Sequence, residues 1–207
     1  MNTGGIASTN CFVLADESTG RAALFDAPDH TTGPLLDAVD REGWMLESLF
    51  LTHGHFDHVA DHSVVSTRFP DAKVWLHPLD VPKLRFPHAL PFPLPFTIPA
   101  REPDLLLNDD QTIQVGSLTG RVMHTPGHSP GHVVFYFATE EVLVGGDLII
   151  CGSVGRTDFP DGDVEQLNAS VRRVIALPAA TRLLPGHCDA STLAEEMKSN
   201  SYVRRLR

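Results

Sequence analysis

The sequence is poor in the features that mark several large classes of protein. Its 207 residues include three cysteines, Cys11, Cys151 and Cys188, whose odd number and wide spacing predict no disulfide framework. No apolar run approaches the roughly 18 residues needed to span a bilayer. The first ten residues lack both the basic residues and the apolar stretch of a signal peptide. We therefore expect a single domain over residues 1–207, in a reducing, cytoplasmic compartment.

Positive charge is also scarce. Sixteen Lys and Arg stand against 26 Asp and Glu, which gives a formal net charge of −10. This balance argues against nucleic acid or an anionic membrane surface as the main partner, so we expect a small-molecule substrate and a monomer or homodimer. Histidine, in contrast, is abundant: eleven in this length fit a metal site.

Short apolar runs separated by turn residues predict an α/β fold. The expected strands are residues 11–15, 22–25, 48–51, 74–76, 122–123, 133–137, 142–144 and 182–184. The expected helices are residues 34–42, with Gly43 as the C-cap residue, 57–69, capped by Asp57, 164–177 and 191–205.

Seven of the sixteen prolines lie between positions 82 and 103. Proline lacks the backbone donor and disfavours helix in the preceding residue, so we expect neither helix nor interior strand from Arg85 to Pro103. A surface linker is one interpretation. The apolar residues Phe86, Phe92, Leu94 and Phe96 favour a stiff loop near the active site, because long loops inside a compact domain are often functional.

Residues 52–58 read Thr-His-Gly-His-Phe-Asp-His and hold four metal-ligand side chains in six positions. His53 and His55 are spaced i and i+2, so in an extended segment both rings leave the backbone on one side. Asp57 and His58 are neighbours and must diverge. The segment therefore predicts two adjacent metal centres, since imidazole and carboxylate are the usual ligands of zinc and its first-row neighbours.

Three further candidates follow apolar strands through glycine. They are His128 in Thr-Pro-Gly-His, Asp147 in Gly-Gly-Asp and His187 in Pro-Gly-His. Alone, each would be interpreted as a turn or capping residue. Glycine lets the backbone turn sharply, and ligands at the ends of successive strands converge on one edge of a sheet.

The ligand count predicts two divalent metal ions. His53, His55 and His128 would hold one, Asp57, His58 and His187 the other, and Asp147 would bridge them. Such a site leaves room for a shared water and supplies hydroxide near neutral pH. The predicted chemistry is hydrolysis of an activated acyl compound, with Asp57 and Asp147 as the catalytic carboxylates. Zinc is expected first, and iron or manganese also suits this ligand set.

The His-x-His-x-Asp-His motif and the later His, Asp and His resemble the metallo-β-lactamase superfamily, from about Asn10 to the C-terminus. The resemblance implies an αβ/βα four-layer sandwich with the metal site at one edge of the β-sandwich. It implies the same seven ligands, with Asp147 shared.

Finer features are similar to short glyoxalase II-like hydrolases, which include the hydroxyacylglutathione hydrolases that split S-lactoylglutathione. These features are Asn10-Cys11, Gly-Gly-Asp-Leu-Ile, the segment 152–163 and Ser-Asn-Ser-Tyr. Typical full-length members of that group carry a C-terminal helical extension, which we do not expect here. This chain also has Arg156-Thr157-Asp158 in place of Lys-x-Tyr, and Asp189 in place of a tyrosine. Arg156 is then the candidate for holding a substrate carboxylate.

Two other interpretations fit parts of the sequence. Persulfide dioxygenases, which use one iron on glutathione persulfide, share the fold and the segment Gly-Arg-Thr-Asp-Phe, whereas Pro-Gly-His-Cys favours the hydrolase. A domain that only binds is disfavoured, because no ligand is missing. Among the other histidines, we expect His132 to pack or hydrogen-bond near the site and His62 to be a solvated helix residue, while His88 has no comparable setting.

Overall fold

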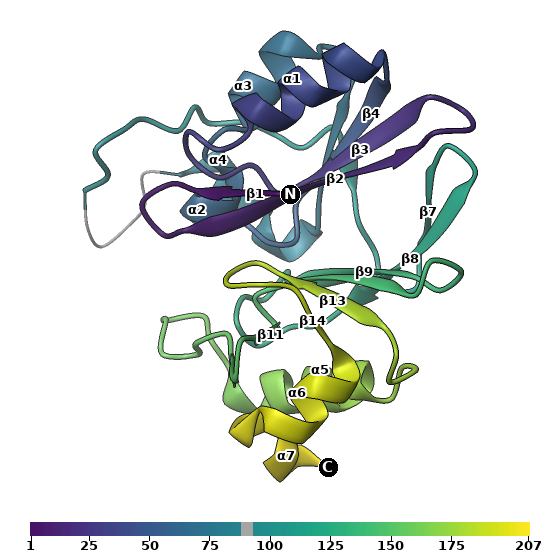
Figure 1. Ribbon diagram of the computed structural model, residues 1–207. Coiled ribbons are helices and arrows are strands. Elements are labelled where there is room, and N and C mark those ends of the chain that lie inside the picture. Colours follow the sequence, from purple (N-terminus) through teal and green to yellow (C-terminus); the bar gives the residue numbers. More distant parts are fainter. Residues whose placement is uncertain (88–92) are drawn as a thin grey trace. The chain divides into compact units, whose positions relative to one another are not determined.

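The computed structural model describes residues 1–87 and 93–207 (Figure 1), so His88 and Phe92 lie outside the described residues. The chain forms two compact units. Unit 1 comprises residues 1–107 and 114–118, and unit 2 comprises residues 108–113 and 119–207. Each unit is built around its own mixed sheet, which is the α/β pattern that the alternating runs predict.

The sheet centred on unit 1 has the order β1-β2-β3-β4-β5-β6. Its strands are β1 (Asn2–Gly4), β2 (Thr9–Asp16), β3 (Arg21–Phe25), β4 (Met45–Phe50), β5 (Lys73–Leu76) and β6 (Leu105–Leu106). The first three strands are antiparallel, and β3 to β6 run parallel. The carboxyl ends of β3, β4 and β5 therefore share one edge with the amino end of β2.

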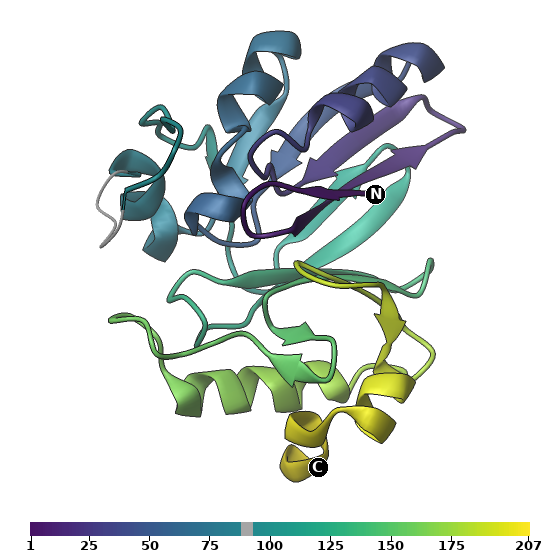
Figure 2. The same ribbon diagram turned by 60° about the vertical axis from the view of Figure 1, so that its left-hand side comes forward.

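Helices cover one face of this sheet. They are α1 (Gly33–Glu42), α2 (Phe56–Val59), α3 (His62–Arg68), η1 (Pro78–Asp80) and α4 (Val81–Arg85). Figures 1 and 2 show α1 and α3 side by side over the strands. Leu36 of α1 and Val65 of α3 pack with Leu24 and Leu49 of the sheet in one buried cluster. The helix α1 ends at Gly43 with φ of 68°, a left-handed conformation, so the prediction for this helix is confirmed.

The prediction of one continuous helix over residues 57–69 is wrong, because the segment forms two helices, α2 and α3, with a break between them. Asp57 does not cap α2, since His55 holds the cap position. At the break, the Asp61 N–H donates to the carbonyl of Ala27, and its carboxylate accepts from Thr32 Oγ1 at 2.9 Å. These bonds to the preceding loop replace the hydrogen bonds that a continuous helix would need.

The helix α4 ends at Arg85, where the segment predicted to lack helix and strand begins. Pro82 lies in the first turn of α4, where the missing N–H has no partner to lose. Residues 93–104 form neither helix nor strand. Leu94 and Phe96 pack against the apolar cluster of unit 1, and Ile98 is fully buried, so this part of the segment is packed rather than a solvated linker.

Residues 114–118 return to unit 1 and form a turn against the β2–β3 hairpin. The backbone N–H and the hydroxyl of Ser117 both donate to Asp16 Oδ2 at 2.7 Å, and Ser18 donates to the other carboxylate oxygen. These donors hold the pKa of Asp16 well below its usual range, the Ser18 hydrogen bond contributing most. The carboxylate thus ties two turns that are about a hundred positions apart in sequence.

The second sheet has the order β14-β13-β10-β9-β8-β7. Its strands are β7 (Thr112–Val115), β8 (Leu118–His124), β9 (Val133–Phe137), β10 (Val142–Gly146), β13 (Arg182–Pro185) and β14 (Ser191–Thr192), and β11 (Ile149–Ile150) pairs with β12 (Ser153–Val154) as a separate hairpin. Strand β9 is antiparallel to β8 and β10, and β13 is parallel to β10. The carboxyl ends of β8, β10 and β13 therefore share an edge with the start of β9.

Three helices pack on this sheet: α5 (Val164–Ile175), α6 (Leu193–Ser199) and α7 (Ser201–Leu206). Leu167 and Val171 of α5 and Val203 of α7 contribute to the apolar cluster of unit 2. The predicted single helix 191–205 is wrong, because residues 191–192 form β14 and the helix breaks at Asn200. The Asn200 side chain accepts from the N–H groups of Tyr202 and Val203 and so starts a new helix.

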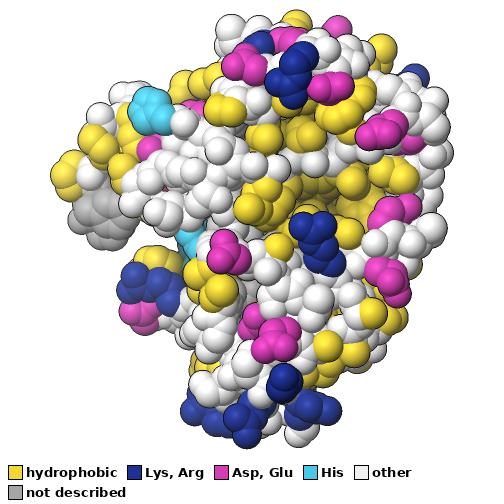
Figure 3. All heavy atoms as spheres, viewed as in Figure 1, with side chains coloured by type: hydrophobic (Ala, Val, Ile, Leu, Met, Phe, Trp, Pro, Cys, Tyr) yellow, Lys and Arg dark blue, Asp and Glu magenta, His cyan; other side chains and the backbone are white. Residues whose placement is uncertain are grey.

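The last helix ends in a basic turn. Arg204 and Arg205 are exposed, and Figure 3 shows Lys and Arg side chains gathered at this end of the chain. None of the helices in the described part of the chain has the length and apolar character needed to cross a membrane.

Candidate metal centre

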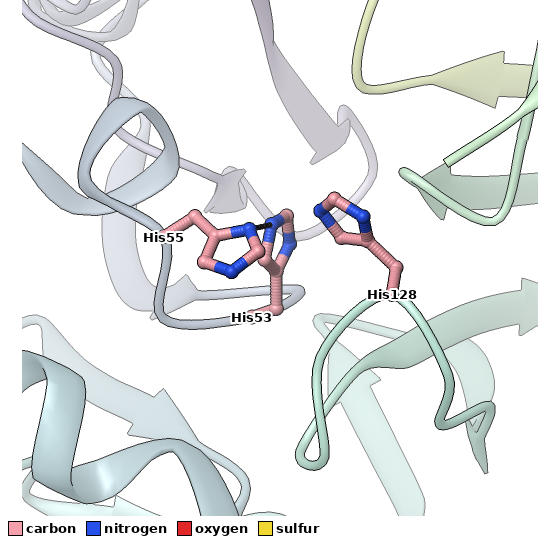
Figure 4. A group of neighbouring side chains, drawn as sticks. All are labelled: His53, His55 and His128. Carbon is pink, nitrogen blue, oxygen red and sulfur yellow. Dashed lines mark hydrogen bonds between the residues drawn. The ribbon is translucent and has the colours of Figure 1, made fainter. Parts of the chain in front are cut away.

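The loop after β4 carries four of the predicted ligands. His53 and His58 are fully buried, Asp57 is 8% exposed and His55 is half-buried. Figure 4 shows the rings of His53 and His55 turned toward each other on this loop, with His53 Nε2 and His55 Nδ1 3.1 Å apart. The i, i+2 spacing thus places both imidazoles on one side of the peptide, as predicted.

Asp57 and His58 form a second pair on the first turn of α2. The predicted divergence of these neighbours is wrong, because the Nε2 atom of His58 lies 3.5 Å from Asp57 Oδ2. Two ligands that share a tetrahedral metal, each about 2.0–2.2 Å from it, stand about 3.3–3.5 Å apart. The separation and the donor types therefore fit ligands of a common ion.

Asp26, which the sequence reasoning missed, supports this loop from the end of β3. Its carboxylate accepts from His58 Nδ1 at 2.9 Å, from the Thr52 N–H at 2.8 Å and from the Thr52 hydroxyl. The contact places the His58 proton on Nδ1 and leaves the Nε2 lone pair for a metal. Asp26 follows an apolar strand just as Asp147 does, so the same strand-end pattern could have found it.

Thr9, at the amino end of β2, holds Asp57. Its hydroxyl donates to Asp57 Oδ2 at 2.8 Å, and both side chains are buried. No sequence signal marks Thr9, because a buried threonine at the start of a strand is common in any fold.

The three ligands predicted in unit 2 come from three loops. His128 follows β8 and is seen on its own loop in Figure 4, Asp147 follows β10, and His187 follows β13. Asp147 Oδ2 lies 3.4 Å from His128 Nε2 and 3.2 Å from His187 Nε2. One carboxylate oxygen faces both rings, at separations that suit metal ligands.

Two of these predicted ligands, His128 and Asp147, have a fixed support within unit 2. His128 Nδ1 donates to the carbonyl of Arg156 at 2.8 Å, and His132 Nε2 accepts from the Asp147 N–H at 3.0 Å. The Thr125 hydroxyl bonds to His132 Nδ1, so His132 hydrogen-bonds near the site as predicted. Gly155 has no room for a side chain, because a Cβ there would lie 3.0 Å from the His128 ring and closer still to the Asp147 carbonyl.

The sequence pattern of the Metallo-beta-lactamase superfamily matches residues 4–187, a stretch that contains all seven candidate ligands. The chain belongs to this superfamily. The predicted α/β sandwich class is thereby confirmed, since solved metallo-β-lactamase structures align with nearly the whole chain.

Two curated relatives carry the name hydroxyacylglutathione hydrolase. The chain is 31% identical over 201 residues to "Hydroxyacylglutathione hydrolase GloC" of Haemophilus influenzae, a match that covers 94% of this chain and 92% of that relative. It is 33% identical over 176 residues to a "Hydroxyacylglutathione hydrolase" of Cereibacter sphaeroides, covering 85% of this chain and 61% of the relative.

Solved structures of the superfamily include three near neighbours. BLEG-1 B3 metallo-beta-lactamase aligns with a TM-score of 0.89 at 32% identity over 98% of both chains. TTHA1623 in a di-iron-bound form gives a TM-score of 0.78 at 34% identity, covering 97% of this chain and 98% of the other. ETHE1 from Myxococcus xanthus gives 0.77 at 25% identity, covering 98% and 84%.

Arg156, the predicted substrate contact, is exposed and already engaged in this metallo-β-lactamase chain. Its guanidinium donates to both carboxylate oxygens of Asp158 and lies 4.4 Å from the centre of the Phe159 ring. That ring in turn lies edge-on to His128, with the ring centres 6.0 Å apart. A substrate carboxylate would therefore have to compete with Asp158 for the arginine.

His62 is not the solvated residue that the sequence suggested. It is 2% exposed, and its Nε2–H donates to the carbonyl of Pro99 at 2.9 Å. Burial lowers its pKa from the ordinary value of 6.5. Its role is to join α3 to the proline-rich segment.

Proposed function

We propose that this metallo-β-lactamase domain is a metal-dependent hydrolase that cleaves a thioester such as S-lactoylglutathione. The observation that carries the proposal is the presence of all seven candidate ligands in a chain of which some curated relatives are named hydroxyacylglutathione hydrolases. A small acyl thioester is the expected substrate, and a reducing, cytoplasmic compartment fits three cysteines that form no disulfide within the described residues.

In this proposal the ligands form a dinuclear centre to which both units contribute. His53, His55 and His128 would hold one ion, Asp57, His58 and His187 the other, and Asp147 would be shared. The candidate ligand groups among the described residues support this division: two have these compositions, and a third joins His53, His58 and Asp147. Within unit 2, the single Asp147 oxygen facing both His128 and His187 supports its shared role.

Two divalent ions, when bound, would supply Lewis-acid activation of water and of the thioester carbonyl. The chain's own groups would then orient the reactants. Asp57, held by Thr9, and Asp147, held through its backbone by His132, are the carboxylates that can hold a water and accept its proton. We expect zinc first, with iron or manganese as the alternatives that this ligand set also accepts.

A second candidate function is a mononuclear iron persulfide dioxygenase. The likeness to ETHE1 and the segment Gly155 to Phe159 favour it. Arg156 would serve either function, because a glutathione carboxylate is present in both substrates.

The test is the loss of thioester absorbance when purified protein, loaded in turn with zinc, iron or manganese, meets S-lactoylglutathione. Asp147→Ala is the inactive variant, and Asp71→Ala is the matched control, an exposed aspartate on the loop before β5. Oxygen uptake with glutathione persulfide and hydrolysis of a chromogenic β-lactam run beside it.

Turnover of the thioester by wild type and Asp71→Ala, absent in Asp147→Ala, would support the proposal. Oxygen uptake with the iron-loaded protein and no thioester turnover would replace it by the dioxygenase. β-Lactam hydrolysis alone would contradict both.

A further inference from the structure

Asp80 is a fully buried carboxylate that the reaction proposed above does not use. It lies at the end of η1, beyond the carboxyl end of β5. A buried charge is costly unless it is paired and hydrogen-bonded. Its Oδ1 lies 3.2 Å from Lys83 Nζ, and its Oδ2 accepts from the backbone N–H of Gly54 at 2.7 Å.

Asp80 is placed to cap the helix α4, but its side chain does not do so. It stands at the N-cap of α4, where an aspartate usually accepts from the first N–H groups of the helix, and a lost cap costs about 1 kcal/mol. Its side chain makes no such bond. The carboxylate is directed to Gly54 instead, 26 positions earlier in the chain.

Gly54 is the residue between His53 and His55. Its backbone is packed against the segment that carries Asp80, because a Cβ at Gly54 would lie 2.8 Å from Lys83 Cβ and 3.0 Å from the Asp80 carbonyl. A charge-assisted hydrogen bond of 2.7 Å to its N–H fixes the peptide that joins the two histidines. The orientation of that peptide sets the directions in which both rings leave the backbone.

We propose that Asp80 is a positioning residue for the metal centre, fixing the Gly54 peptide so that His53 and His55 converge on one ion. Lys83 compensates the buried carboxylate. The inference rests on the proposed function only in taking these two histidines as metal ligands. It concerns metal affinity and not the identity of the substrate.

The test titrates metal-free protein with Co²⁺ alone and follows the visible absorption of the bound ion, with thermal unfolding of the metal-free protein measured in parallel. We expect Asp80→Ala to weaken Co²⁺ binding by about tenfold or more and to change the absorption spectrum. Asp80→Asn keeps an acceptor for the Gly54 N–H and should recover most of the affinity. Asp71→Ala should bind Co²⁺ like wild type.

A merely structural role would lower the unfolding temperature of Asp80→Ala and leave the Co²⁺ affinity and spectrum unchanged, which would overturn the inference. If Asp80→Ala does not fold, Asp80→Glu carries the test, because it keeps the charge and displaces the acceptor by one methylene. Wild-type affinity in that variant would contradict positioning.

The two proposals fail in different ways. If the wild-type protein binds Co²⁺ and hydrolyses no thioester, the proposed function is contradicted and the positioning role of Asp80 is not. A wild-type protein that binds no Co²⁺ contradicts the metal centre itself, and with it both proposals.

Discussion

The two units carry the candidate metal ligands in different ways. Unit 1 places four of them on one loop within six positions, whereas unit 2 draws three from loops spread between positions 128 and 187. The loop of unit 1 is fixed by ionisable carboxylates, Asp26 and Asp80. The ligands of unit 2 are fixed by a backbone carbonyl and a histidine.

This difference shows two solutions to one problem. A short loop dense in ligands needs strong local anchors, because nothing else sets the directions of neighbouring side chains. Ligands on separate loops take their positions from the register of β8, β10 and β13, so weaker supports suffice. The predictions below test this contrast, starting with the residue whose loss should matter most.

Asp147→Ala should abolish hydrolysis, with a fall in kcat/KM of at least about a thousandfold, roughly 4 kcal/mol. The Asp147 Oδ2 atom faces both His128 and His187, two of the candidate ligands. Its removal should also lower the metal content measured by mass spectrometry. Full activity in this variant would sink the dinuclear mechanism.

Asp26→Asn should weaken metal binding by about 10- to 100-fold, because an amide cannot satisfy the His58 and Thr52 donors as a carboxylate does. A competition titration against a coloured chelator measures the change. Asparagine tolerates the left-handed backbone of residue 26, where φ is 59°, so folding should be retained. An unchanged affinity would show that the unit 1 loop does not depend on this anchor.

His132→Phe should have a smaller effect, about tenfold on metal affinity. The variant removes the acceptor of the Asp147 N–H, but the strand register still places the Asp147 loop. The same chelator competition checks it. A loss larger than that of Asp26→Asn would reverse the contrast between the units.

The smallest expected effect is on the pH dependence of stability, and it comes from His62, which is not one of the candidate ligands. Burial lowers the pKa of His62 in the folded chain, so the unfolded state binds more protons below pH 6.5. The free energy of unfolding therefore decreases as the pH is lowered below 6.5. Urea unfolding at pH 7.5 and 5.5 should show a smaller loss for His62→Gln than for wild type. His30→Gln, a change at an exposed histidine, should leave the difference as it is in wild type.

Much of this arrangement could be predicted from sequence, because it depends on short motifs of neighbouring residues. The side-chain types at residues 52–58 are enough to predict metal binding. Each later candidate ligand follows an apolar strand through glycine. The break between α2 and α3 was missed because its cause is distant: Asp61 bonds to Thr32 and Ala27. Asp80 was missed for a similar reason, since an aspartate before a helix looks like a cap until its partner 26 positions away is known.

The return of residues 114–118 to unit 1 bears on how the gene could be divided. A fragment that stops at residue 107 would lack Ser117, and with it two of the hydrogen bonds that keep Asp16 ionised in the hairpin turn. A fragment that starts at residue 108 would carry that turn without its acceptor. Expression of either half alone should therefore give a less stable product than its size suggests, and complementation of the two would need a cut elsewhere in the chain.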